Sequence, residues 1–193
     1  MFVEKLTNDS LSFLAKRRGL QLQQMKAEAI CNESMTALVS RVFDRIEQYS
    51  VELNAYLGCT DLQTSLTRPA HVREVTRYSK NRQPLETVTY FRARLASPTW
   101  SLIIRGKDST VEVFLLPVGK SLGLTKSEAD YEPIFVLTAT LIKSIQEVEW
   151  ELEDRGLTQM REQALSMEMF VRLIEATRNE LEMDTVYDSS IEY

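Results

Sequence analysis

The sequence predicts an α+β fold, with an antiparallel sheet of about five strands packed by long N- and C-terminal helices. Two patterns of hydrophobic residues carry this prediction. Near both ends of the chain, apolar residues recur at steps of three and four, which is the spacing of a helix face. Through the middle they alternate with polar residues, as in a strand with one buried face. Helices and strands that occupy separate stretches of a chain favour a sheet with helices packed against it.

The first 60 residues predict a long helix. Gly19 is the only glycine between Leu11 and Leu57, and no proline interrupts this stretch. From Met25 onward, a stripe of apolar residues is typical of a helix that pairs with another helix. The alternative is a single amphipathic helix that lies on the sheet of its own chain. The residues at which we expect self-association are Met35, Val39, Val42, Ile46, Tyr49 and Leu53.

Alternating residues predict the strands of the sheet. Residues 86–95 are rich in β-forming residues, and Ser97-Pro98 ends this strand. Residues 60–69 indicate a connector between the helix and the sheet. Further strands are expected at residues 134–141 and 146–153, with a weaker one at residues 72–78.

A hairpin is predicted where residues 100–105 and 110–116 flank a turn at residues 106–109. If Arg105 faces Thr110, one face of the hairpin is entirely apolar, as a strand pair with one buried side requires. The residues on that face are Trp100, Leu102, Ile104, Val111, Val113 and Leu115.

The C-terminal part of the chain predicts two more helices. Thr125 and Glu128 fit a capping box for a short helix over residues 125–132. Thr158 can cap a final helix that reaches about Leu181 and is apolar around much of its surface. We therefore expect the final helix to pack on the sheet and on another helix at once.

These patterns divide the chain into three parts. Residues 1–60 are a long helical, coiled-coil-like segment, and residues 61–183 are an α+β domain with the sheet and the C-terminal helix. Residues 184–193 are an acidic tail that we expect to be disordered.

Charge is sorted along the chain. Residues 1–60 carry seven basic and seven acidic residues, residues 61–107 carry nine and three, and residues 108–193 carry seven and eighteen. Basic residues interleaved with aromatic ones can hold nucleic acid on a sheet, although the net charge of −5 and the lack of a recognition motif argue against it. The candidates for contact with a partner or with nucleic acid are Arg73, Arg77, Tyr90, Arg92, Arg94 and Arg105.

The acidic end includes a strand pattern with one acidic face, at Glu147, Glu149, Glu151 and Glu153. Such a row could bind a divalent cation or a basic partner, and a solvated outer face is the alternative. If this strand lies beside the basic strands, cross-strand charge pairs form. If it does not, two surfaces of opposite sign remain.

Few residues suit catalysis. The only histidine is His71, which excludes a metal site with two histidine ligands. The segment Gly119-Lys120-Ser121 lacks the upstream glycine of a phosphate-binding loop. Cys31 and Cys59 indicate reduced thiols rather than a metal site or a disulfide. We therefore expect a non-enzymatic, cytoplasmic protein with no cofactor, metal or membrane span.

The predicted order of elements is similar in topology to that of type III secretion chaperones, which are small, acidic, dimeric proteins that hold partner polypeptides. The long N-terminal helix and the basic middle differ from that family. The helical stripes and the sorted charge favour a chaperone-like or adaptor regulatory protein that forms a homodimer and binds a protein partner. The alternative is a nucleic-acid-binding regulator that uses residues 68–107.

Overall fold

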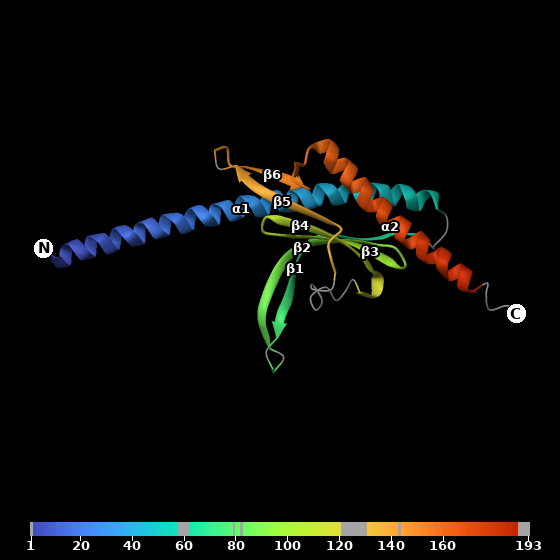
Figure 1. The fold of residues 1–193 in the computed structure, drawn as a ribbon, viewed down its shortest axis with the longest axis horizontal. Coiled ribbons are helices and arrows are strands. Elements are labelled where there is room, and N and C mark those ends of the chain that lie inside the picture. The colour runs from blue at the N-terminus through green and yellow to red at the C-terminus, as the bar shows by residue number, and fades with distance from the viewer. Residues whose placement is uncertain are drawn as a thin grey trace.

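The computed structural model describes residues 2–57, 62–78, 80–81, 83–120, 131–142 and 144–188. It confirms the α+β class, with two long helices packed on one antiparallel sheet (Figure 1). The sheet has seven strands in chain order, each paired with its neighbour in sequence. The elements are α1 (Phe2–Tyr56), β1 (Ser65–Tyr78), β2 (Pro84–Ala96), β3 (Trp100–Lys107), β4 (Thr110–Pro117), the 3-10 turn η1 (Val118–Lys120), β5 (Phe135–Ile142), β6 (Glu147–Leu152), β7 (Arg155–Gly156) and α2 (Gln159–Asp188).

The two strands beyond the predicted five lie at the edges of the sheet. β1 begins at Ser65, so the predicted connector at residues 60–69 is wrong in its second half. Pro69 is tolerated because β1 is an edge strand whose register shifts between Thr67 and Ala70. β7 follows a tight turn in which Glu153 and Asp154 both have positive φ, as a two-residue hairpin turn requires.

The β3–β4 hairpin has the predicted faces but a tighter turn. Arg105 pairs with Glu112 rather than with Thr110, and Thr110 pairs with Lys107. The turn therefore contains only Asp108, with a φ of 53°, and Ser109. The difference in register is two residues, and side chains alternate with a period of two, so every residue stays on its predicted face.

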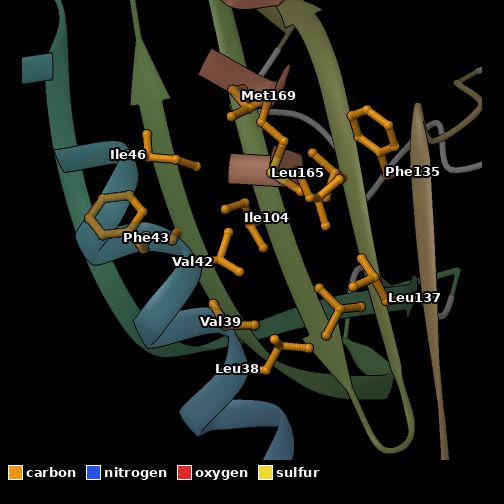
Figure 2. Close-up of a cluster of buried hydrophobic side chains, with 14 of the residues drawn as sticks. Leu38, Val39, Val42, Phe43, Ile46, Ile104, Phe135, Leu137, Leu165 and Met169 are labelled. Atoms are coloured by element: carbon orange, nitrogen blue, oxygen red, sulfur yellow. The ribbon is translucent and has the colours of Figure 1, made fainter. Parts of the chain in front are cut away.

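The hydrophobic core lies between the helices and one face of the sheet (Figure 2). Six residues of α1 between positions 35 and 46 point into it, among them Leu38, Val42 and Phe43. Apolar residues of β3, β4 and β5 form its floor, and α2 closes it with Leu165 and Met169. The packing of α1 is close enough that Gly106 of β3 touches the side chain of Met35.

Polar contacts fix the helices relative to each other and to the sheet. The buried carboxylate of Glu162 in α2 accepts hydrogen bonds from Arg41 at 3.3 and 3.1 Å and lies 3.3 Å from a guanidinium nitrogen of Arg45. The indole of Trp150 donates to Ser34 Oγ at 2.9 Å. These contacts join α1 to both α2 and β6.

The final helix is longer than predicted. Thr158 Oγ1 accepts a hydrogen bond from the backbone N–H of Arg161 at 3.4 Å, which confirms it as the cap. α2 continues through residues 184–188, and the rest of the predicted tail lies outside the described residues. Residues 125–130 of the predicted short helix also lie outside them. In the described part of the chain, neither long helix contains a segment apolar enough to span a membrane.

Candidate functional site

The predicted basic site is divided between the two faces of the sheet. Tyr90, Arg92 and Arg94 share the outer face, which is the face turned away from the helices, as their alternation predicts. Arg73 pairs with Thr89 and therefore lies on the other side of the β1–β2 ribbon, on the side of Phe91. The six candidate residues do not converge on one surface. The backbone of Arg77 pairs with that of Glu86, and the side chain of Arg77 lies outside the described part.

Arg105 is enclosed within the outer face. Its guanidinium carbon lies 4.7 Å from the centre of the Tyr90 ring and 4.9 Å from that of Phe114. Its Nη2 atom is 2.6 Å from Oε2 of Glu112, the residue directly opposite on β4. Arg105 and Tyr90 are both buried, at 6% and 5% exposure. The guanidinium of Arg105 therefore contacts the rings of Tyr90 and Phe114 and the carboxylate of Glu112 within the sheet, and these contacts stabilise the fold.

Arg92 and Arg94 are the more accessible of the outer-face candidates, and both are half-buried. The exposed Lys107 lies beside them, with Nζ 6.0 Å from the centre of the Tyr90 ring. Arg94 donates from Nε and Nη2 to Ser101 Oγ, at 3.1 and 2.9 Å. Burial, and then the nearby charge of Arg92, lower the pKa of Arg94. Because a guanidinium remains charged at neutral pH, this lowering means that the sheet holds two neighbouring cations at an energetic cost.

The acidic strand does not pair with the basic strands. β3, β4 and β5 lie between β2 and β6, and threonines of β5 face the acidic residues. Glu149 pairs with Thr140, and Glu151 pairs with Thr138. The arrangement with cross-strand charge pairs is therefore wrong, and the outer face is basic at β2 and acidic at β6. Among the described residues, no group of three or more histidine, cysteine or acidic side chains is placed to hold a metal ion.

His71 lies at a hollow of about 510 Å³ between α1 and the β1–β2 ribbon. Its ring centre is 4.9 Å from that of Phe91. The described lining offers the hydroxyls of Thr87 and Thr89 and the carboxylate of Asp108, but neither serine nor cysteine. A Ser-His or Cys-His pair is therefore not formed by the described residues around His71.

The predicted self-association stripe lies in the core of its own chain. Met35, Val39, Val42 and Ile46 are at most 3% exposed and pack against the sheet. Tyr49 and Leu53 extend this packing, and the Tyr49 ring lies 5.8 Å from that of Phe170 in α2. This part of α1 is therefore an amphipathic helix that lies on the sheet of its own chain, which was the alternative prediction. The six residues pack within the chain.

The first half of α1 has a different environment. Its N-terminal part projects beyond the sheet (blue in Figure 1), and no side chain from residue 10 to residue 33 is buried. We call residues 10–33 the arm. Six of its large apolar side chains are at least 55% exposed, namely Leu11, Phe13, Leu14, Leu20, Leu22 and Met25. By helical periodicity Leu11, Leu14, Leu22 and Met25 share one side of the helix, and apolar surface of this kind is typical of an interaction site.

Between Leu20 and Ile30, one side of the arm faces the β5–β6 hairpin. A hollow of about 600 Å³ separates it from the β5–β6 hairpin, and Leu20, Ala27 and Ile30 line this hollow with Leu141 and Gln146. The opposite side of the helix presents an arm stripe with steps of three, four, four, three and four residues. Its six members are all exposed, namely Leu11, Leu14, Arg18, Leu22, Met25 and Ala29.

Sequence reasoning missed the arm stripe because it followed a spacing of 3.5 residues, which starts at Met25. The signal that finds the stripe is an eleven-residue repeat, which relates Leu11 to Leu22 and Leu14 to Met25. Comparisons of this chain with protein family models, with curated proteins and with solved structures gave no match.

Proposed function

We propose that this protein is a non-enzymatic adaptor or chaperone-like regulator that acts by associating with other polypeptide chains through the arm. The observation that carries this proposal is the row of large apolar side chains on a helix that leaves the body of its own chain. A helix of ordinary composition gains most of its stability from packing rather than from helix propensity. None of the described residues buries the side of the arm that carries its stripe, so a partner helix or groove completes it.

The free energy gained by burying the arm residues can offset the cost of associating two chains. Burial of one large apolar side chain contributes about 1.5 to 3 kcal/mol. Association of two chains costs roughly 4 to 15 kcal/mol in lost freedom of motion. Four or more of the arm residues must therefore be covered together for stable binding. The arm offers four such residues on one side within 15 residues of helix, namely Leu11, Leu14, Leu22 and Met25.

Nucleic-acid binding has weaker support. A stacking platform needs exposed aromatic rings beside phosphate-binding cations. Tyr90 is buried, Arg105 is held between Tyr90, Phe114 and Glu112, and Arg73 lies on the other face. Among the described side chains of the candidates, Arg92 and Arg94 remain together at the surface, with Lys107 near Tyr90, which is a small set for a phosphate-binding face.

Comparative affinity capture with purified variants tests the proposal. We expect polypeptides bound by the full chain to be lost when Leu22 and Met25 in the arm are replaced by glutamate. The matched control replaces Met160 and Met167, which are exposed apolar residues of α2, by glutamate. If both variants lose the bound polypeptides equally, or if neither loses them, the arm is not the docking element.

A further inference from the structure

We infer that the arm stripe is covered by the arm stripe of a second copy of this chain, with the two arms antiparallel. This inference rests on the proposed function and names the partner of the same surface. It follows from three properties of the arm, which are the side on which the stripe lies, the spacing of its residues and the distribution of its charges.

The first property is the side of the arm on which the stripe lies. The described part of the same chain does not cover that side. The β5–β6 hairpin faces Leu20, Ala27 and Ile30, and the stripe lies on the opposite side by helical periodicity. Leu11, Leu14, Leu22 and Met25 remain more than half exposed.

The spacing is that of a helix-pairing seam. Eleven residues fill three turns of a nearly straight helix, so residues 11 apart stay on one line along it. The stripe also maps onto itself when its direction is reversed about residue 20. In that pairing Leu11 meets Ala29, Arg18 meets Leu22, and Leu14 falls within one residue of Met25. The arginine stem then covers a leucine while its charged end reaches water.

The charges select the antiparallel direction. Residues 10–21 contain Lys16, Arg17 and Arg18 and no acidic residue. Residues 22–33 contain one basic residue, Lys26, and two acidic ones, Glu28 and Glu33. A parallel pair in register would place three cations against three cations and Arg18 against Arg18. An antiparallel pair about residue 20 places these three cations against residues 22–24 of the second copy, which carry no charge.

The first test is the mass of the purified full chain in solution. Light scattering should give twice the chain mass of 22.2 kDa. Replacement of Leu22 and Met25 by glutamate should give a monomer with an unchanged near-ultraviolet spectrum of Trp100 and Trp150, because the arm does not enter the core. The control with glutamate at Met160 and Met167 adds the same charge and should remain dimeric.

The second test is the sign of a charge reversal. Replacement of Arg17 and Arg18 by glutamate should change the affinity of an antiparallel dimer by less than about threefold, because positions 17 and 18 face the uncharged Gln23 and Leu22. The same change should tighten a parallel dimer, because the facing segments of residues 16–18 then each carry one net negative charge in place of three positive charges.

Three outcomes overturn the inference. They are a full chain that is monomeric at all concentrations, a dimer that survives the Leu22 and Met25 changes, and a dimer that tightens on reversal of Arg17 and Arg18. A monomer that binds vesicles of phosphatidylcholine and phosphatidylserine would assign the arm to a lipid surface instead. A monomer that still captures proteins through the arm would overturn the second copy as occupant and leave the proposed function intact.

Discussion

At the scale of single residues, Arg105 illustrates how a polar group enters a sheet. Its guanidinium is desolvated, and this cost is offset by a hydrogen-bonded carboxylate and by two ring faces. The sequence predicted the outer face of Arg105 correctly. It could not predict the burial of that face at Ile103, Phe114 and Leu116, because burial depends on what packs against the sheet.

Gly106 is the residue at which the backbone of β3 comes closest to α1. A Cβ atom at this position would overlap Sδ of Met35 and lie 2.9 Å from its Cγ. Met35 is buried, and its side chain would have to shift toward the hollow beside His71, which it lines together with Gly106. We expect Gly106→Ala to lower the free energy of unfolding by about 1 to 3 kcal/mol, the usual cost of overpacking, as measured by urea denaturation.

Two comparisons control this experiment. Gly156→Ala adds the same methyl group where no atom lies within 4 Å, and it should change stability little. Truncation of Met35 to alanine in the Gly106→Ala background should cost less than the same truncation in the natural chain. If the truncation lowers the free energy of unfolding equally in both chains, the side chains at positions 35 and 106 do not overlap.

At the scale of elements, α1 is one helix with two environments. Its second half buries a stripe against the sheet, and its first half presents a different stripe to solvent. Periodicity in the sequence identified the buried residues, such as Val39 and Ile46, but not what covers them. A spacing of three and four residues is the same whether a helix packs on a sheet or on a second helix.

Gly19 weakens the arm because glycine loses more backbone entropy in a helix than any other residue. No atom of another element lies within 4 Å of the site of its missing Cβ. We expect Gly19→Ala to stabilise the arm by about 0.5 to 1 kcal/mol and to slow hydrogen exchange of its amides about two- to fivefold. The reverse change, Ala15→Gly, should accelerate exchange by a similar factor. Both variants belong in the Leu22 and Met25 glutamate background, so that association does not contribute.

The strands show which local signals are decisive. The β2, β3 and β4 patterns were predicted because alternation over six or more residues has no helical equivalent. β1 was predicted only in part, because Pro69 and polar residues near position 65 resemble a connector. An edge position makes that sequence acceptable in a strand, and edge position is a property of the completed sheet.

At the scale of the whole molecule, the order of the strands in the sheet follows their order in the sequence and not the attraction between oppositely charged strands. The basic and acidic strands have matching two-residue spacing, yet they lie apart because each strand pairs with its neighbour in sequence. Short connections close such pairs at low entropic cost. A cross-strand charge pair contributes only about 0.2 to 1 kcal/mol, which is too little to change the order of a sheet.

The body of the protein should fold without the arm. All side chains from residue 10 to residue 25 are exposed, and the buried part of α1 begins at Met35. We expect removal of residues 1–25 to change the free energy of unfolding by less than about 1 kcal/mol relative to the monomeric full-length variant. The denaturation midpoint of the natural chain should rise with protein concentration, and that of the shortened chain should not. A shortened chain that fails to unfold cooperatively would place the arm within the folding unit.

Because α1 is one continuous helix, the arm has a fixed length and direction relative to the sheet. At about 1.5 Å per residue, the helix from Phe2 to Glu33 extends roughly 50 Å from the point where α1 meets the sheet. A flexible linker of the same length would have a mean end separation of roughly 30 Å and no preferred direction. Whatever binds at the far end of the arm is therefore held at a set distance and angle from the sheet, and a turn of one is transmitted as a turn of the other.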